Sequence, residues 1–363
     1  MKQNYFSNQY VDIKNPELID RKSFEYLAGY QDVYCMTINL PPKFKTKDSI
    51  ENLTREFKNQ LINSNQQLDY QGLNAASFKN LIRNLLDVFQ NWNDFHHHKS
   101  LVIYCSTTFV KTYYAPIELP FKIYLNNHFY LKTVSQLFNS VTQKLILYIS
   151  ESHSSLFELK NVAYEKRFEI KNNKRIESYP NKYIGLIHNE VTNLKELKDQ
   201  KQLVSLLVTG KKELVDSFIK KSVNKISNME SIYVSETKAI DEIKEKTISK
   251  LGSIIQNQAE IFRLQAKNSE IIDKELDVII KASNQGEIKN LFIEKDFELF
   301  GEYDINNDFV FVGNEEDRLG SLANMAAVKT VLNNGNVFLL SKEEMPIQNC
   351  GMNAVVSLIP DIE

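Results

Sequence analysis

Residues 318–340 read RLGSLANMAAVKTVLNNGNVFLL and contain the clearest structural pattern in the chain. Apolar residues recur at helical spacing from Leu319 to Val331, which predicts a helix over residues 318–332 with one buried face. The turn Asn333-Asn334-Gly335 ends this helix, because glycine and asparagine accept the left-handed conformation found at helix ends. The apolar run at 337–340 then predicts a buried strand. A helix followed at once by a buried strand is typical of α/β folds.

The same alternation continues on both sides of this stretch. A helix is expected over residues 274–282, and Gly286 ends it before the apolar strand at 288–293. After Met345-Pro346, a final apolar run at 354–359 predicts another strand. These elements together predict an α/β sandwich module over residues 271–363.

The order of helices and strands in this module, and the turn residues that separate them, resemble the C-terminal domain of archaeo-eukaryotic peptide-chain release factors. The matching segments are Gly286-Glu287-Ile288, Leu322-Ala323-Asn324-Met325-Ala326-Ala327, residues 330–337 and Met345-Pro346. Within that superfamily the chain most resembles the bacterial branch, often abbreviated baeRF, because strand-like runs at 101–106 and 144–150 lie where that branch has two successive strands. The resemblance implies an N-terminal α/β domain over residues 1–140, a ribonuclease-H-like middle domain over 141–270 and a C-terminal α/β/α sandwich over 271–363.

The residues before the terminal module show the same mixture of helices and strands. In the first region, the patterns predict strands at 33–40 and 101–105, an irregular segment from 113, and helices at 43–61, 78–89 and 131–138. In the second region, they predict strands at 145–149, 155–159 and 162–170, a polar stretch over 171–200, a strand at 203–208, and helices at 213–222 and 237–266. The expected fold class is therefore α/β, with some α+β elements.

Composition excludes several classes of protein. The chain has 363 residues, of which 42% are apolar, so two or three packed domains are expected. Its 44 lysines and arginines nearly balance its 46 aspartates and glutamates, so no overall charge points to nucleic acid or to a membrane. The 3 cysteines are far apart in sequence, which argues against a disulfide framework or a thiolate metal site. No segment has the length and apolar character of a signal peptide or a membrane span, so we expect a cytoplasmic protein without a membrane span.

The motifs of release-factor chemistry are missing from the chain. The family hydrolyses peptidyl-tRNA with a Gly-Gly-Gln tripeptide, but none of the 11 glycines is adjacent to another, and Gly185 is the only one between residues 168 and 203. The Asn-Ile-Lys-Ser decoding motif is also absent, and the segment from Cys105 to Phe109 matches only part of the second decoding motif, with Ile103 at its tyrosine position. We therefore expect no catalytic residue of the family type and no hydrolysis of peptidyl-tRNA.

Cations interleaved with aromatic residues mark the middle region. Cations neutralise phosphates and aromatic rings stack on unpaired bases, which is what RNA binding requires. A second basic cluster includes Lys220, Lys221 and Lys225, on and after the next predicted helix. The alternative is that these charges only solvate strand and helix faces, as charge runs usually do. The candidate RNA-binding residues are Lys166, Arg167, Lys171, Lys174, Arg175, Lys182, Lys211 and Lys212.

Two sequence patterns resemble metal sites, and neither predicts one. His96-His97-His98 could bind a divalent metal, but adjacent histidines point in different directions and a loop is the simpler interpretation. Asp304, Asn306, Asp308 and Glu315 match positions of a calcium loop, but Phe309 stands where the sharp turn of that loop requires glycine. We therefore expect no metal and no cofactor.

The leading hypothesis is a non-hydrolytic, release-factor-like protein that binds the ribosome or another structured RNA in stalling, rescue or hibernation. One alternative is a metal-dependent nuclease or hydrolase with an unrecognised site, although the strands at 145–149 and 203–208 contain no carboxylate. The other is an interaction module that recruits protein partners through the C-terminal domain. The sequence leaves the oligomeric state open.

Overall fold

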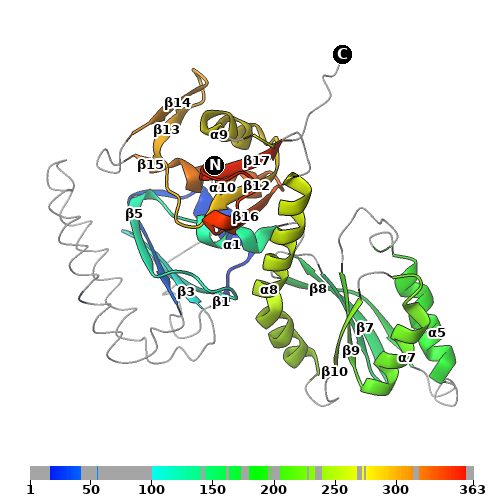
Figure 1. Ribbon diagram of the computed structural model, residues 1–363. Coiled ribbons are helices and arrows are strands. Elements are labelled where there is room, and N and C mark those ends of the chain that lie inside the picture. Colours follow the sequence, from blue (N-terminus) through cyan, green and yellow to red (C-terminus); the bar gives the residue numbers. More distant parts are fainter. Residues whose placement is uncertain are drawn as a thin grey trace. The chain divides into compact units, whose positions relative to one another are not determined.

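A computed structural model shows a mixed α/β chain (Figure 1), as the sequence predicts. It describes residues 17–41, 55, 100–139, 144–160, 163–172, 180–194, 197, 205–226, 229–233, 239–267, 272–273, 275–313 and 319–356. The helices predicted at 43–61 and 78–89 lie outside the described residues, apart from position 55, which is helical. The chain divides into two compact units. The first comprises Met1–Val134, Leu276–Gln285 and Asp296–Lys329, and the second comprises Ser135–Glu275, Gly286–Lys295 and Thr330–Glu363.

The first unit contains a five-stranded sheet of order β1-β4-β3-β2-β5. Its strands are β1 (Glu17–Leu18), β2 (Gln31–Leu40), β3 (Ser100–Ser106), β4 (Val110–Ala115) and β5 (Lys122–His128). Every residue of β3 is buried, which explains the continuous apolar run at 101–105 between its two terminal serines. The irregular segment predicted from residue 113 is wrong, because Tyr113 and Tyr114 pair with β3 as part of β4. Helix α1 (Arg21–Ala28) begins at Asp20, whose carboxylate accepts a hydrogen bond from the Ser23 N–H (2.7 Å).

Residues from late in the chain complete the first unit. They form helix α9 (Leu276–Gln285), the start of helix α10 (Leu322–Leu332) and a small sheet of order β14-β13-β15. The strands of this sheet are β13 (Phe300–Asp304), β14 (Phe309–Val312) and β15 (Gly320–Ser321). The predicted helix start at 318 is therefore wrong, because Ser321 pairs with Phe300 and its hydroxyl then accepts a hydrogen bond from the Asn324 N–H (3.0 Å). A serine in this position begins the helix at Leu322.

The second unit contains a five-stranded sheet of order β10-β9-β6-β7-β8. The strands are β6 (Lys144–Ile149), β7 (His153–Lys160), β8 (Ala163–Lys171), β9 (Ser205–Gly210) and β10 (Met229–Tyr233). The first three form an antiparallel meander, and β9 and β10 continue the sheet in parallel after the crossover helices α5 (Pro180–Thr192) and α7 (Lys212–Ser222). Helix α5 lies within the stretch interpreted as polar from the sequence. Its buried residues Tyr183, Ile184, Ile187 and Val191 recur at helical spacing, which was the signal for it.

A four-stranded sheet of order β11-β17-β12-β16 also belongs to the second unit. Its strands are β11 (Ile272–Asp273), β12 (Ile288–Glu294), β16 (Asn336–Leu340) and β17 (Met352–Val356). Two helices precede these strands in the chain, the short α4 (Lys132–Ser135) and the long α8 (Ala239–Lys267). Phe262 of α8 stacks on Phe338 of β16, with ring centroids 5.6 Å apart. The predicted turn before β16 is present: Asn334 has a φ of 63°, and a Cβ on Gly335 would lie 2.4 Å from the Ile288 carbonyl oxygen. Only glycine permits that close approach.

Candidate functional site

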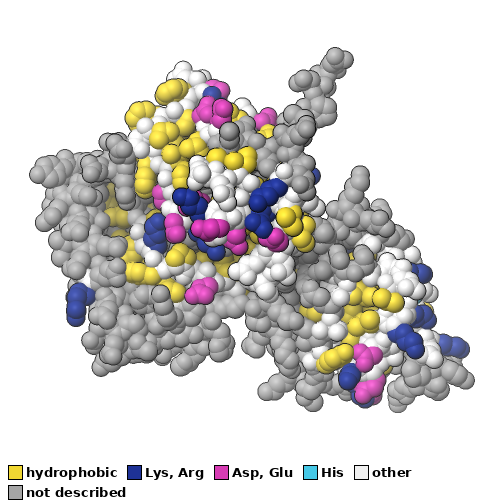
Figure 2. All heavy atoms as spheres, in the orientation of Figure 1, with side chains coloured by type: hydrophobic (Ala, Val, Ile, Leu, Met, Phe, Trp, Pro, Cys, Tyr) yellow, Lys and Arg dark blue, Asp and Glu magenta, His cyan; other side chains and the backbone are white. Residues whose placement is uncertain are grey.

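Helices α5 and α7 form a layer on one face of the β6–β10 sheet. Tyr183, Ile187 and Phe218 from the helices pack on Leu147 and Val208 from the strands in one apolar cluster. The phenol of Tyr183 also makes a hydrogen bond with the Ser154 hydroxyl (2.5 Å). Burial of these residues fixes the facing sides of the two helices, so their polar residues point outward. In Figure 2, dark blue lysine and arginine side chains lie over the region that these helices occupy in Figure 1.

Exposed lysines gather where α5 and α7 meet. The Nζ of Lys221 lies 3.3 Å from the position that a Cβ on Gly185 would take, so this ammonium group rests against the α5 backbone. Lys182 lies one turn before Gly185, and Lys225 lies one turn after Lys221. Within the described chain, Lys220, Lys221 and Lys225 are exposed and make no ion pair. Their charge is therefore available to an anion.

A buried histidine lies next to the lysines of this surface. The ring Nδ1 of His188 lies 2.8 Å from the Ser222 hydroxyl, and both side chains are buried between α5 and α7. Burial lowers the pKa of His188, and the positive charges of Lys225 and Lys221 lower it further. A bound anion near the two lysines would oppose that effect.

The other predicted RNA-binding residues lie elsewhere on the same sheet. Lys211 and Lys212 stand at the start of α7, where Lys211 pairs with Glu151 (2.5 Å) and the Lys212 Nζ lies 5.8 Å from the centre of the Tyr233 ring. On the edge strand β8, Lys166 pairs with Glu169 (2.6 Å). Arg167 pairs with Glu158 across the register shift between β7 and β8. Lys174 and Arg175 lie outside the described residues.

Strand register separates these cations into two groups. Lys171 faces away from the α5–α7 layer, because its neighbour Ile170 packs into the cluster beneath the helices. Arg167 is the extra residue at the register shift, and Lys166 lies opposite Phe157. Lys166 therefore also faces away, because Leu156, the neighbour of Phe157, packs into that cluster. Lys182 lies on α5, on the helix side of the sheet. The structure therefore brings Lys182 together with the second basic cluster rather than with Lys166 and Lys171. In the sequence, Gly185 stands as a lone glycine and His188 as an isolated histidine, and neither was assigned to this surface, although the spacing of the buried residues of α5 would have placed both on one helix.

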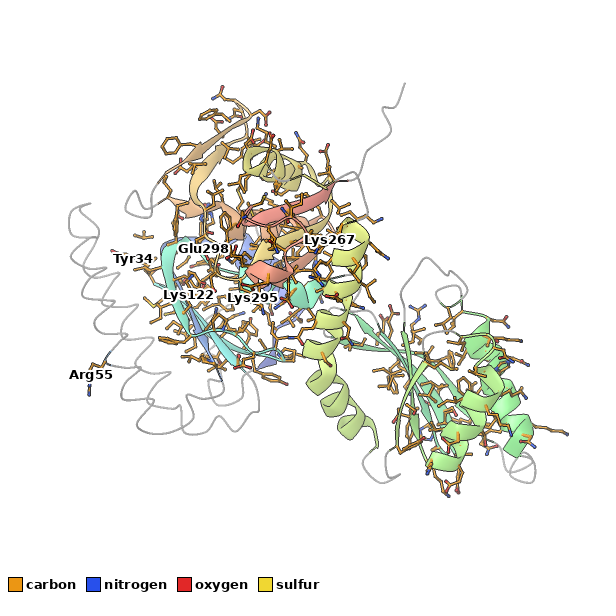
Figure 3. The ribbon with its side chains drawn as sticks, in the orientation of Figure 1. Tyr34, Arg55, Lys122, Lys267, Lys295 and Glu298 are labelled. Carbon is orange, nitrogen blue, oxygen red and sulfur yellow. The ribbon has the colours of Figure 1, made fainter. Side chains whose placement is uncertain are left out.

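A second polar cluster is buried in the first unit. The Nζ of Lys132 donates hydrogen bonds to the Phe297 carbonyl (2.6 Å) and to Glu298 Oε1 (2.9 Å). Glu298 also accepts from the Tyr130 hydroxyl at Oε1 and from the Ser321 hydroxyl at Oε2 (2.8 Å). Lys122, labelled with Glu298 in Figure 3, adds a cation at 3.5 Å. The cluster joins residues about 170 positions apart in the sequence (from 130 to 298).

Opposing effects set the ionisation of this cluster. Burial raises the pKa of Glu298, but the charge of Lys132 and the hydrogen bonds from Tyr130, Lys132 and Ser321 outweigh it, so this pKa lies below its usual value. Burial lowers the pKa of Lys132, and the carboxylate of Glu298 opposes the shift. Because the Lys132 side chain is only 1% exposed, a substrate cannot reach its amino group, and the cluster acts as a structural ion pair.

The segment that partly matches a decoding motif forms the β3–β4 turn. The hydroxyl of Tyr30 lies 2.8 Å from the Thr108 hydroxyl, and the carboxylate of Asp32 accepts from the N–H (3.1 Å) and the hydroxyl (2.5 Å) of Thr107. Burial raises the pKa of the Cys105 thiol well above its usual value and that of Cys35 to about 12. Neither thiol is therefore a reactive nucleophile at neutral pH.

The two metal-like patterns have different outcomes. Asp304 accepts from the Asn306 N–H (2.9 Å) and from the Asn307 side chain (2.7 Å), so its carboxylate closes the β13–β14 turn. His96, His97, His98 and Glu315 lie outside the described residues. Among the residues that the structure describes, no three histidine, cysteine or carboxylate side chains group as metal ligands would. Within the same residues, no helix has both the length and the apolar character needed to cross a membrane.

Comparison with known proteins gives structural neighbours only. No protein-family model and no curated protein matches the chain. The archaeal translation termination factor aRF1 is similar at 13% identity and a TM-score of 0.25, covering 93% of this chain and 98% of that chain. Archaeoglobus fulgidus Pelota is similar at 14% identity and a TM-score of 0.34, covering 70% and 79%. A ribosome-bound archaeal Pelota, in a model with ABCE1, is similar at 13% identity and a TM-score of 0.34, covering 72% and 73%.

These neighbours are release-factor-like proteins, the superfamily that the terminal module resembles in sequence. The assignment to the bacterial branch stays a prediction.

Proposed function

We propose that this protein is a non-hydrolytic, release-factor-like factor that binds the ribosome or another structured RNA in the cytoplasm, in stalling, rescue or hibernation. The observation that carries the proposal is the group of exposed lysines on α5 and α7. Lys220, Lys221 and Lys225 make no ion pair within the described chain, and Lys182 lies on the neighbouring helix. Exposed cations gathered on one surface are what a phosphate backbone requires.

Two further features support the release-factor part of the proposal. An antiparallel meander followed by two parallel strands, with crossover helices on one face, is the arrangement expected of a ribonuclease-H-like middle domain. We retain the three-domain layout over residues 1–140, 141–270 and 271–363 as part of this proposal. The chain also lacks adjacent glycines, so it cannot form the Gly-Gly-Gln loop of the family. We therefore propose that it binds without hydrolysing peptidyl-tRNA.

Binding is tested with a charge-reversed variant and a matched control. In the test variant, glutamate replaces Lys220, Lys221 and Lys225. In the control, glutamate replaces three other exposed lysines, Lys22, Lys289 and Lys342. We expect the test variant to bind ribosomes and purified ribosomal RNA at least ~10-fold more weakly than wild type, and to lower the slope of log affinity against log salt by about 2. Filter binding over a salt series and sucrose-gradient sedimentation measure both effects.

Several outcomes would contradict the proposal. Equal binding by the test and control variants would show that the α5–α7 lysines do not contact RNA. Wild-type protein that never enters ribosomal fractions, in growth, starvation or induced stalling, would overturn ribosome binding. Release of peptide from peptidyl-tRNA would contradict the non-hydrolytic assignment. Metal-stimulated cleavage of RNA, DNA or tRNA by the purified chain would favour the alternative of a nuclease.

A further inference from the structure

The β13–β14 hairpin of the first unit presents large apolar side chains to solvent. Ile305 is 69% exposed, Phe309 59%, Phe311 50% and Val312 53%. Figure 2 shows yellow side chains over this hairpin at the upper left of the molecule. Apolar residues that gather in one exposed patch mark an interaction site more often than scattered ones do.

Among the described residues, strand β14 has a strand partner on one side only, and helix α9 lies near it, with Lys281 paired to Asp308 at the hairpin turn (3.2 Å). In the sheet of order β14-β13-β15, β14 is a terminal strand, and within the described chain no strand pairs with its outer edge. The Gly313 N–H donates to the Phe300 carbonyl (3.0 Å), and hydrogen bonds alternate in direction along an antiparallel strand. The odd-numbered residues from 309 to 313 therefore bond to β13, whereas the N–H and C=O groups of Val310 and Val312 point to the open edge.

We propose that two copies of this chain associate through β14, antiparallel and about a two-fold axis between the two Phe311 residues. In this register, Val310 of one copy lies opposite the partner's Val312, and the reverse pair is equivalent. Each of these two pairs exchanges two backbone hydrogen bonds, so the open-edge groups of both strands are satisfied. This proposal is independent of RNA binding.

The sequence of β14 favours this register and this partner. Val310 and Val312 meet on one face of the paired strands, and the two Phe311 rings meet on the other. Phe309 lies opposite the partner's Gly313, where an aromatic ring shields the exposed glycine backbone. No charged residue enters the paired segment. The strand is therefore complementary to itself over residues 309–313.

Neighbouring registers are less favourable. A symmetric pairing centred on Val310 would place Asp308 opposite the partner's Val312, and only the central pair would exchange two hydrogen bonds between open-edge groups of β14. A shift by one residue would place side chains related by the two-fold axis on opposite faces of the sheet, which symmetry forbids. The paired edges are short, so the interface lies below the ~1,200 Å² of a standard complex, and we expect a dissociation constant in the micromolar range.

The oligomeric state of the full chain tests the proposal. Sedimentation equilibrium from about 1 to about 200 μM should show a monomer–dimer equilibrium for wild type. F311K and F311E should each weaken dimerisation at least ~10-fold, because like charges meet at the two-fold axis. An equimolar mixture of the two variants should dimerise again, because opposite charges then meet. Wild type that remains monomeric at the highest concentration, or F311K that dimerises as wild type does, would overturn the proposal.

Cysteine cross-linking tests the register separately. Phe311 forms a pair without hydrogen bonds across the axis, where Cα atoms are ~4.5 Å apart and a disulfide fits. The two Phe309 residues are displaced by four positions, ~14 Å, so they cannot be bridged. In a C350S background, mild oxidation should therefore give a covalent dimer with F311C and none with F309C. Equal cross-linking of the two variants would reject this register, and the F309C chain controls for loss of folding.

Discussion

At the residue scale, Lys132 shows how a buried charge is tolerated. We expect Lys132→Met to destabilise the protein by about 2–3 kcal/mol, because Glu298 then keeps its negative charge in a buried site without its main cation. Lys122→Met should cost less than about 1 kcal/mol, since Lys122 is partly exposed and lies 3.5 Å from the carboxylate. Urea denaturation of the two variants measures the difference.

A double variant distinguishes this explanation from lost packing. Lys132→Met combined with Glu298→Gln removes both charges, so we expect it to be more stable than Lys132→Met alone. If the second substitution adds a further loss instead, the cost at position 132 comes from packing and the ion-pair account is wrong.

His188 gives a second prediction at the same scale, for the pH dependence of stability. Its pKa in the folded protein is lowered by burial and by Lys225 and Lys221. The unfolded chain therefore binds a proton first as pH falls below ~6.5, and this destabilises the folded state between ~6.5 and the lowered pKa. His188→Gln should reduce the slope of unfolding free energy against pH in that window, by an amount that corresponds to at most about one bound proton. Urea titrations between pH 5 and 7 measure this slope, and an unchanged slope would contradict the prediction.

At the scale of elements, Asn324 of α10 fixes the start of α4. Its side-chain oxygen accepts hydrogen bonds from the backbone N–H groups of Leu131 (2.7 Å) and Lys132 (2.8 Å), and its nitrogen donates to the Phe129 carbonyl (3.3 Å). Asn324→Ala leaves two N–H groups without an acceptor, so we expect a loss of about 2 kcal/mol and faster hydrogen exchange at residues 131–132.

The aspartate variant is the matched control for this position. Asn324→Asp keeps both acceptor bonds and loses only the donor to Phe129, so its thermal midpoint should lie between those of wild type and Asn324→Ala. An alanine variant as stable as wild type would show that the contact is not needed to begin α4.

Elements were predictable from the sequence where their signal is local. The turn before β16 and the strands with continuous apolar runs follow from spacing and from Gly335, because such patterns depend on adjacent residues only. The start of α10 was misplaced because Ser321 pairs with Phe300, about 20 positions earlier, and a strand contact of this kind leaves no periodicity in the sequence. Helix α5 was missed although its buried residues recur at helical spacing, because its charged neighbours dominated the composition of the stretch.

For the candidate sites, too, local features could be predicted from the sequence and contacts between distant residues could not. The lysines could be identified from the sequence as candidate RNA-binding cations. Which of them share a surface depends on strand register and helix packing, so the sequence alone did not show that Lys182 and Lys166 lie on different faces of the sheet. The cluster around Glu298 had no sequence signal, because its members come from segments about 170 residues apart (130 and 298). Burial alone turns these ordinary polar residues into a connected network.

At the scale of the whole molecule, the first unit is built from segments that are distant in the sequence. Glu298 satisfies the buried charge of Lys132, and Asn324 caps α4, so the sheet from β1 to β5 depends on residues supplied after position 275. By contrast, the described residues of the apolar cluster beneath α5 and α7 all lie between Leu145 and Met229. The two regions should therefore respond differently to truncation.

We expect a fragment of residues 141–235 to unfold cooperatively on heating, because it contains the whole of that apolar cluster. A fragment of residues 1–140 should lack a cooperative transition and exchange its β2 and β3 amides rapidly, because Lys132 then has no carboxylate partner and the α4 N–H groups have no cap. Circular dichroism melts and hydrogen exchange of both fragments, with the full chain as reference, measure this contrast. A cooperative melt of the 1–140 fragment would mean that its own apolar core suffices, and that the Lys132–Glu298 and Asn324 contacts add order without determining the fold.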